Sequence, residues 1–194
     1  MAKSIGIIAN TVDYYPDFIP NSQNLYQELL NQIKDVLSQH TIKVWNREVK
    51  EPRLGAFFSL GGIQGYSYSK SKRPTFDITK YSILEQLRKQ CSEVLKVEFN
   101  SCLVNWYRDG NDYIGEHSDD ETDLKKSNIA SLSLGSERDF VLKSKSDKTD
   151  RKVLKLASGS MVHMYGQCQK LYKHSVPKRK RVKIGRLNIT FRVV

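Results

Sequence analysis

The stretch GRLNITFRVV, residues 185–194, alternates between polar and apolar side chains. Its polar residues are Arg186, Asn188, Thr190 and Arg192, and the apolar residues between them are Leu187, Ile189 and Phe191. Because successive side chains of a β-strand point to opposite faces, this pattern predicts a strand with one polar and one apolar face. The polar face is either solvated or lines the interior of a barrel. In a barrel, the two arginines would need anionic partners, which a small dicarboxylate would supply.

Most of the chain after Val97 has a similar strand-like character. Short runs rich in β-branched and aromatic residues are separated by turn formers, at residues 96–107, 128–135, 138–145, 152–158 and 159–166. Before them, apolar periodicity predicts one helix over about residues 22–38 and a second from near Ser82, where Ser82 and Glu85 match a capping box. Residues 51–74 carry aromatic residues among glycines and are interpreted as hairpins or loops. The expected fold class is α+β, with a sandwich-like or barrel-like core and helices packed outside it.

The composition bounds the class of protein. With 194 residues, 39% of them hydrophobic, the chain is expected to form a single globular domain over residues 1–194. No apolar run approaches the roughly 20 residues that cross a bilayer, and the first residues lack a signal-peptide pattern, so we expect no membrane partner. The net charge of +11 favours nucleic acid as a partner, although a lysine-rich surface that serves solubility explains it equally well. The 3 cysteines lack CxxC spacing, which indicates free thiols in a reducing compartment.

The stretch GEHSDDE, residues 115–121, gathers acidic side chains beside a histidine in this basic chain. In an extended segment His117 and Asp119 share one face, where together they could hold a divalent metal. One more histidine would complete a two-histidine, one-carboxylate facial triad, which leaves positions open on ferrous iron. His40 follows the first predicted helix, outside the predicted core. Strand periodicity does not choose between His163 and His174 as the third ligand.

Four motifs occur in an order and spacing that resemble the AlkB-like dioxygenases. They are NWY at 105–107, HSD at 117–119, HSVP at 174–177 and RLNITFR at 186–192. The resemblance implies a double-stranded β-helix, or jelly roll, over about residues 97–194. It also implies Fe(II), 2-oxoglutarate as co-substrate and O2. The implied iron ligands are His117, Asp119 and His174, not His163, and the implied 2-oxoglutarate contacts are Asn105, Tyr107, Arg186, Asn188, Thr190 and Arg192.

The resemblance extends to the DNA-repair branch of that family. HSDDE at 117–121 and the stretch IASLSLGSERDF at 129–140 are similar to it, and residues 44–53 and 65–69 resemble its nucleotide-recognition segment, here about residues 40–75. The implied substrate-binding residues are Trp45 as a wedge in the duplex, Arg53 at a phosphate, Tyr66 and Tyr68 stacked on a flipped base, and Glu121 accepting from its amine. The basic runs 70–73 and 178–183 are further candidates for phosphate contact. Trp45 could instead be a core residue, and the two tyrosines could be structural aromatics of a hairpin.

The implied activity is oxidative demethylation of N-alkylated bases in DNA, such as 1-methyladenine and 3-methylcytosine. The methyl group would be hydroxylated and lost as formaldehyde, on a nucleotide flipped out of its stack. Two alternatives stay open: the same chemistry on RNA or on a protein side chain, and a non-catalytic nucleic-acid-binding module that kept the fold. We expect a monomer that binds single- or double-stranded DNA inside the cell, in the cytoplasm of a prokaryote or the nucleus of a eukaryote.

Overall fold

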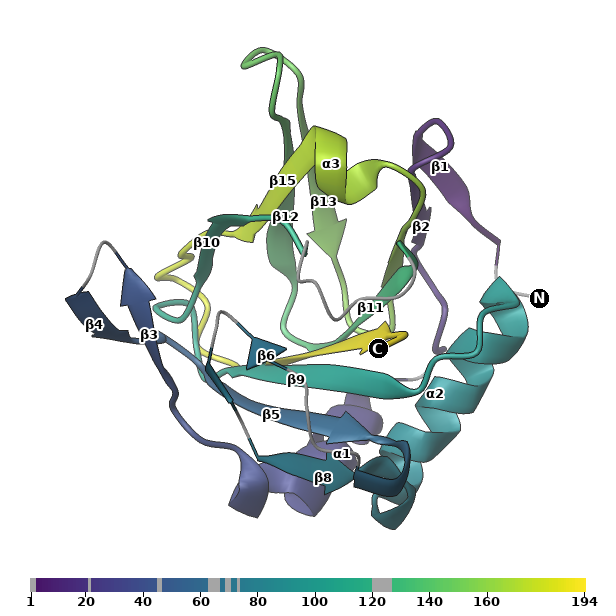
Figure 1. Cartoon of the computed structure of the whole chain (residues 1–194), viewed down its shortest axis with the longest axis vertical. Helices are drawn as coiled ribbons and strands as arrows, with labels where there is room; N and C mark the ends of the chain where they lie inside the picture. The colour runs from purple at the N-terminus through teal and green to yellow at the C-terminus, as the bar shows by residue number, and fades with distance from the viewer. Residues whose placement is uncertain are drawn as a thin grey trace.

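Two β-sheets face each other, and two helices cover the outer face of the larger one. The structure is a computed structural model that describes residues 3–20, 22–44, 47–62, 67–68, 71–72, 74–119 and 127–194, with the backbone alone at 43–44, 67–68 and 71–72. In Figure 1 the smaller sheet lies at the top and the central strands of the larger sheet run below it, with helix α1 (Gln23–Ile33) at the bottom and helix α2 (Ser82–Leu95) along the lower right.

The larger sheet has eight strands in the order β1-β2-β14-β11-β16-β9-β5-β8. These strands span Ile5–Ile8 (β1), Val12–Tyr15 (β2), Met161–Met164 (β14), Ile129–Gly135 (β11), Arg186–Arg192 (β16), Ser101–Tyr107 (β9), Leu54–Ser59 (β5) and Thr75–Asp77 (β8). All neighbours in it pair antiparallel except β5 and β8, which are parallel. Strand β16, the predicted alternating strand, therefore lies inside the sheet between β11 and β9.

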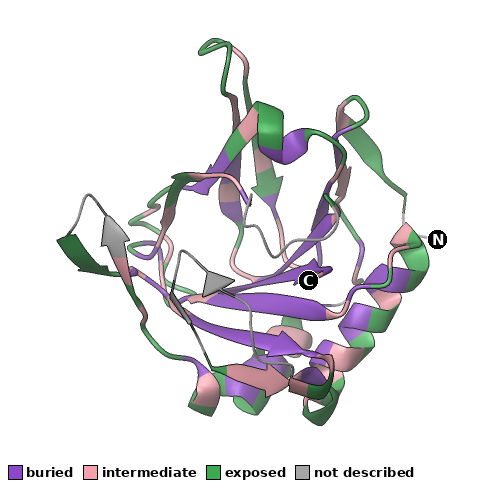
Figure 2. Cartoon of the chain, viewed as in Figure 1, coloured by how far each residue is buried: buried purple, intermediate pink, exposed green. Residues whose placement is uncertain are grey.

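The smaller sheet has four strands in the order β10-β15-β12-β13. They span Ile114–His117 (β10), Tyr172–Val176 (β15), Arg138–Ser144 (β12) and Arg151–Leu156 (β13). Two hairpins lie outside both sheets, β3 (Thr41–Val44) with β4 (Arg47–Lys50) and β6 (Ser67–Tyr68) with β7 (Ser71–Lys72). Both hairpins fall within the segment expected to recognise nucleotides. All four residues of β4 are exposed, whereas the central strands of the large sheet are buried (Figure 2).

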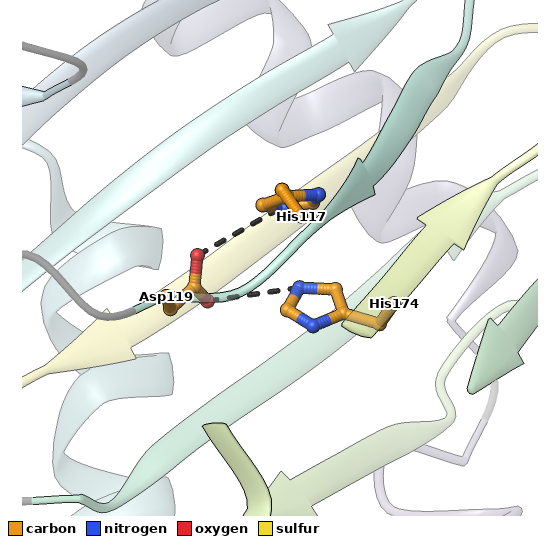
Figure 3. Close-up of side chains that lie close together, drawn as sticks. All are labelled: His117, Asp119 and His174. Atoms are coloured by element: carbon orange, nitrogen blue, oxygen red, sulfur yellow. Dashed lines mark ion pairs between the residues drawn. The ribbon is translucent and has the colours of Figure 1, made fainter. Parts of the chain in front are cut away.

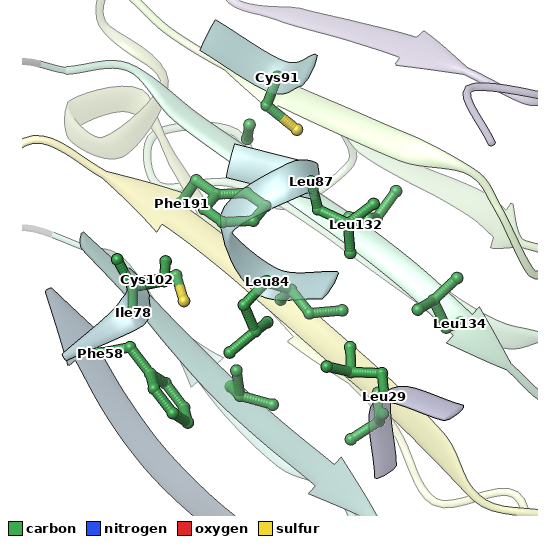
Figure 4. Close-up of a cluster of buried hydrophobic side chains, with 14 of the residues drawn as sticks. Leu29, Phe58, Ile78, Leu84, Leu87, Cys91, Cys102, Leu132, Leu134 and Phe191 are labelled. Atoms are coloured by element: carbon green, nitrogen blue, oxygen red, sulfur yellow. The ribbon is translucent and has the colours of Figure 1, made fainter. Parts of the chain in front are cut away.

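The helices are α1 (Gln23–Ile33), α2 (Ser82–Leu95) and α3 (Cys168–Leu171), with short 3-10 turns at Lys34–Val36, Leu60–Gly62 and Ile78–Lys80. Apolar residues of α1 and α2 pack on one face of the large sheet, where Leu29 and Leu84 join Leu132 and Phe191 in a single cluster (Figure 4). The opposite face meets the small sheet across a second cluster, which includes Tyr107 and Phe140. Among the described residues, none of the helices has both the length and the apolar character that a membrane span requires.

The structure corrects several sequence expectations. The first helix ends at Ile33 and continues only as a 3-10 turn, short of the predicted end at residue 38. Helix α2 does begin at Ser82, but no capping box forms, because Glu85 instead accepts hydrogen bonds from Arg88 at 2.7 and 2.8 Å. Residues 51–74 are not only hairpins and loops, since β5 is a buried strand of the large sheet. A strand that is buried on both faces has a continuous run of apolar residues, so the alternation of polar and apolar residues that identifies a half-exposed strand is absent.

The solvated-face alternative for β16 is wrong. All seven of its residues are buried, and the strand has neighbours on both edges. Leu187, Ile189 and Phe191 point to the helix side, and the four polar residues point to the space between the two sheets. The polar row therefore lines an interior, as the barrel interpretation required.

Candidate active site

Three predicted metal ligands meet between the two sheets. His117 ends β10 and His174 lies opposite it in β15, where the two residues are paired in register. Asp119 follows β10 after a single residue and turns back toward both rings (Figure 3). His117 Nε2 lies 3.7 Å from Asp119 Oδ1, and His174 Nε2 lies 3.8 Å from Asp119 Oδ2. One ligand atom from each residue falls within 4.8 Å of the others, which is close enough for all three to bind one ion.

Both imidazoles are arranged to present a lone pair. His117 Nδ1 lies 2.9 Å from the carbonyl oxygen of Gly115, an acceptor, so Nδ1 carries the proton and Nε2 is left free to bind a metal. His174 is 5% exposed, and burial chiefly, together with the nearby His117, lowers its pKa to about 3. A neutral imidazole is the form that coordinates metals. Two imidazole nitrogens and one carboxylate make the donor set that suits non-haem ferrous iron.

Asp119 is held as a carboxylate and fixed at its backbone. Burial by itself raises the pKa of this carboxyl group, but electrostatic attraction, chiefly from the Arg192 guanidinium, outweighs burial, and the net pKa is lowered. Arg192 Nη2 lies 3.1 Å from Asp119 Oδ1. The backbone N–H of Asp119 donates to Gln169 Oε1 at 2.9 Å. Gln169 thus anchors the segment that carries the ligand, and it comes from α3, a helix too short to be found by periodicity.

A cavity opens beside the triad, and the predicted co-substrate residues surround it. Its lining includes the three predicted ligands together with Asn105, Tyr107, Asn188, Thr190 and Arg192. Apolar side chains such as Leu103, Ile114 and Met164 complete the wall. Five of the six predicted 2-oxoglutarate contacts therefore share one cavity with the triad.

Arg186 lies next to that cavity, behind Tyr107. Its guanidinium carbon is 5.2 Å from the centre of the Tyr107 ring, and its side chain is buried, at 1% exposure. Nη2 donates to Ser133 Oγ at 2.9 Å, while Nε and Nη1 have no hydrogen-bond partner among the described residues. Burial chiefly lowers the pKa of Arg186 to about 10, so the group stays charged at neutral pH. A buried cation with two unused donors fits a carboxylate ligand.

Sequence reasoning missed the residues that support this site. Ser131 Oγ accepts from Asn188 Nδ2 at 2.8 Å, and Ser133 holds Arg186. Both serines lie on β11 two residues apart, so the alternation used for the last strand could have found them. Gln169 had no such signal, because its role depends on how α3 packs against the end of β10.

His163 does not join the triad. It lies in β14 at 8% exposure, its Nε2 is 3.1 Å from Asn128 Oδ1, and its ring stacks on Tyr165 with centroids 4.7 Å apart. His40 is also elsewhere, with its Nε2 3.0 Å from the carbonyl oxygen of Gly55. Among the described residues, the histidine near His117 and Asp119 is His174.

The predicted substrate contacts are only partly visible. Trp45, Tyr66 and Glu121 lie outside the described residues, and Tyr68 is described by its backbone alone. Arg53, expected at a phosphate, is 3% exposed and bound to Glu51 and Asn105 inside the protein. Of the basic runs, the side chains of 70–73 are not described. In the other run, 178–183, Arg179 Nε pairs with Asp139 Oδ2 at 3.1 Å.

Comparison with known proteins gives three kinds of match. A family model described as the 2OG-Fe(II) oxygenase superfamily matches residues 11–192. The DNA oxidative demethylase ALKBH2 of Homo sapiens is 34% identical over 182 residues, covering 89% of this chain and 69% of that protein. The protein of the same name from Mus musculus is 37% identical over 161 residues (79% and 66%), and that from Arabidopsis thaliana is 32% identical over 190 residues (82% and 60%).

A solved structure titled "The structure of OsALKBH1" superposes with a TM-score of 0.63 at 19% identity, over 97% of this chain and 100% of that one. At this identity the match concerns the fold, and with the family match it confirms the predicted jelly roll. The chain spans 60% of the ALKBH2 protein from Arabidopsis thaliana and 66% of that from Mus musculus.

Proposed function

This chain belongs to the 2OG-Fe(II) oxygenase superfamily, as an AlkB-like member, and from that premise we propose that it is an oxidative demethylase of N-alkylated bases in DNA. The bases would include 1-methyladenine and 3-methylcytosine. One observation carries the proposal: a two-histidine, one-carboxylate cluster shares a cavity with residues suited to bind a dicarboxylate. The names of the ALKBH2 relatives support DNA as the substrate.

In this proposal each part of the cavity has a separate task. His117, Asp119 and His174 would hold the iron and leave positions open for co-substrate and oxygen. Arg186 and Arg192 would bind the carboxylates of 2-oxoglutarate through charge-assisted hydrogen bonds. When bound, iron with 2-oxoglutarate and O2 supplies the oxidation that hydroxylates the N-methyl group, which is then lost as formaldehyde.

The other polar residues would orient the co-substrate and keep the ligands in place. Asn105, Tyr107 and Thr190 line the cavity and can donate hydrogen bonds, while Asn188 is held by Ser131. The surrounding apolar wall, with Leu103 and Met164, would exclude water from the reacting groups. Because these polar groups are buried, their hydrogen bonds to a bound anion are stronger than they would be in water.

The target base must leave its stack to reach this interior site. We propose that residues 40–75 perform this step. Trp45 would fill the gap that the flipped nucleotide leaves in the duplex, and Tyr66 and Tyr68 would stack on the flipped base. Glu121 would accept a hydrogen bond from the exocyclic amine. We also propose that residues 1–194 act as one domain, as a monomer, inside the cell. There the net charge of +11 would favour the approach of DNA.

The test is mass spectrometry of methylated oligonucleotides incubated with the protein, ferrous iron, 2-oxoglutarate and ascorbate. Single- and double-stranded DNA and RNA are compared, and succinate is measured in the same reactions. Loss of the methyl group from DNA with matching formation of succinate supports the proposal. Turnover on RNA alone would assign the same chemistry to another substrate. Binding of nucleic acid without succinate formation would identify a non-catalytic binding module.

A further inference from the structure

A buried arginine outside the proposed catalytic residues contacts one of them. Arg53 lies just before β5, and Asn105 lies on the neighbouring strand β9, paired with Gly55. Arg53 Nε donates to Asn105 Oδ1 at 2.9 Å, and Arg53 Nη2 donates to Glu51 Oε1 at 2.8 Å. The side chains of Arg53 and Glu51 are 4% and 2% exposed. This is an interior arrangement and not a surface ion pair.

The contact decides which way the Asn105 carboxamide faces. A carboxamide has an oxygen that accepts and a nitrogen that donates, and the two ends have nearly the same shape. A guanidinium has only donors, so the atom that faces Arg53 must be the oxygen. The NH2 group of Asn105 is then directed away from Arg53, and Asn105 lines the cavity beside the triad.

This orientation matters because the proposed ligand of the cavity is an anion. A carboxylate of 2-oxoglutarate would accept a hydrogen bond from the Asn105 NH2 group but would be repelled by the Asn105 oxygen. Without Arg53, the carboxamide could rotate and present its oxygen to the cavity. A neighbour that excludes the wrong orientation in advance lowers the cost of ordering the side chain when the ligand binds.

Glu51 gives Arg53 the partner that burial requires. An isolated charge inside the protein is costly, and Glu51 supplies the opposite charge at 1% exposure. The backbone of Glu51 is also tied down, because its N–H donates to the carbonyl of His40 at 2.8 Å and its carbonyl accepts from Gln39 Nε2 at 2.8 Å. Both bonds lie at the base of the β3–β4 hairpin, so Arg53 is held from the side of the proposed nucleotide-recognition segment.

We propose that Arg53, held by Glu51, is a positioning residue for 2-oxoglutarate that fixes the Asn105 carboxamide with its NH2 group toward the co-substrate. The inference rests on the proposed function only in taking 2-oxoglutarate as the ligand. It assigns Arg53 a task inside the protein in place of the phosphate contact expected from the sequence.

The experiment is a double-mutant cycle on 2-oxoglutarate binding, which separates positioning through Asn105 from other effects. The full chain, loaded with Mn(II) in place of iron, is titrated calorimetrically with 2-oxoglutarate as wild type, Arg53→Met, Asn105→Ala and the double variant. We expect Arg53→Met and Asn105→Ala each to weaken binding about tenfold, and the double variant to be no weaker than Asn105→Ala. Unchanged affinity in a folded Arg53→Met variant, or fully additive losses, would overturn the proposal.

Arg88→Met is the matched control. Arg88 is also buried, at 8% exposure, and also pairs with a glutamate, Glu85, at 2.7 Å, but it lies on α2 on the far side of the large sheet. We expect Arg88→Met to lower thermal stability and to leave 2-oxoglutarate affinity unchanged. If it lost as much affinity as Arg53→Met, the effect of Arg53→Met would be explained by general destabilisation of the fold. Arg53→Gln keeps an N–H donor and should recover part of the affinity lost in Arg53→Met.

If Arg53→Met does not fold, Asn105→Asp supplies the measurement. Its second oxygen would stand where the NH2 group is directed, so with Arg53 present the affinity should fall further than in Asn105→Ala. Equal or tighter binding by Asn105→Asp would contradict the proposed orientation. The titrations contain no nucleic acid, so a protein that binds 2-oxoglutarate as described but fails to demethylate DNA would refute the proposed function and leave this inference standing. Failure of the wild type to bind 2-oxoglutarate would overturn both.

Discussion

The two faces of the large sheet are built from the same strands and serve opposite purposes. On the helix side, Leu187, Ile189 and Phe191 of β16 pack with α1 and α2 in a cluster of apolar side chains. On the side of the small sheet, the alternate residues of the same strand are polar, and two of them are arginines at 1% and 2% exposure. The helix face stabilises the fold by removing apolar surface from water. The other face places charges where they are costly: Arg192 pairs with Asp119, and Arg186 keeps donors without partners among the described residues that an anionic ligand could use.

The contrast teaches that burial alone does not separate core from site. Phe191 and Arg186 lie on the same strand, and both are almost completely hidden from solvent. What differs is whether the buried group is satisfied by the protein itself. Phe191 packs against apolar neighbours, whereas Arg186 keeps two donors without partners among the described residues. The following predictions separate the two faces experimentally.

The largest effect is expected at the metal ligands. His117→Ala, Asp119→Ala and His174→Ala should each abolish demethylation, because each removes one of the three donors to the iron. Mn(II) binding, followed by electron paramagnetic resonance, should weaken in all three variants, while the melting temperature stays near that of the metal-free wild type.

His163→Ala is the matched control for that prediction. His163 is a buried histidine of the large sheet that bonds to Asn128 and lies outside the triad. Its variant should retain demethylation and metal binding. An inactive His163→Ala together with an active His174→Ala would show that the ligands are assigned to the wrong histidine.

On the helix face, we expect a substitution to lower the stability of the fold and to leave ligand binding unchanged. Phe191→Ala removes a large side chain from a packed apolar cluster, and we expect it to lower the free energy of unfolding by about 3–5 kcal/mol. Chemical denaturation measures the loss, and calorimetry on the fraction that remains folded should find 2-oxoglutarate affinity unchanged. A specific loss of affinity with normal stability would mean that this face also belongs to the site.

The site face should show the reverse pattern. Arg192→Ala and Arg186→Ala each remove a donor group for a carboxylate, and a hydrogen bond to a charged group is worth about 1.5–3 kcal/mol. That corresponds to about a ten- to hundredfold loss of 2-oxoglutarate affinity, with succinate production falling in parallel. Stability should change less than in Phe191→Ala for Arg186→Ala, because the buried charge itself is removed, whereas Arg192→Ala also leaves the buried Asp119 carboxylate without its ion-pair partner. Normal affinity in both variants would argue that the arginines are structural.

The residues of the site face could be predicted from the sequence better than the structure around them. Strict alternation in β16 identified its two faces, and the four motifs predicted the AlkB-like family and the jelly roll, both confirmed by the comparisons. The triad residues were predicted as ligands and lie together, although their role in catalysis stays a prediction. Position along a strand carried this information, because side-chain direction repeats every two residues.

What the sequence did not reveal depends on contacts between distant segments. Strand β5 has buried residues on both faces, so no alternation marks it. The partners of Arg53 could not be read from spacing, since Asn105 lies 52 positions away in the chain. Gln169 sits in a four-residue helix, too short for any helical period to appear. In each case the deciding fact is a tertiary contact.

A smaller and more selective effect is expected at Trp45, in the segment between β3 and β4. As a wedge it would fill the gap left by a flipped nucleotide, and base–aromatic stacking is worth about 1–3 kcal/mol. Trp45→Ala should therefore keep single-strand activity and lose about tenfold or more on duplex DNA. A core tryptophan would instead lower stability by about 3–5 kcal/mol and reduce both activities together. Both activities and the melting temperature are measured on the same variant, and an equal loss of activity on single-stranded and duplex DNA would contradict the wedge role of Trp45.

The smallest effect is expected where the site is supported through the backbone. Gln169→Met keeps a side chain of similar length but removes the oxygen that accepts from the Asp119 N–H. A neutral hydrogen bond contributes about 1 kcal/mol, so Mn(II) affinity should fall roughly fivefold, while 2-oxoglutarate affinity at saturating metal stays normal. Lys170→Ala, at an exposed position on the same helix, should change neither quantity. If Gln169→Met bound Mn(II) as tightly as the wild type, the Asp119 carboxylate would be positioned by Arg192 of the large sheet and the two histidines of the small sheet, and α3 would contribute nothing to the support of the site.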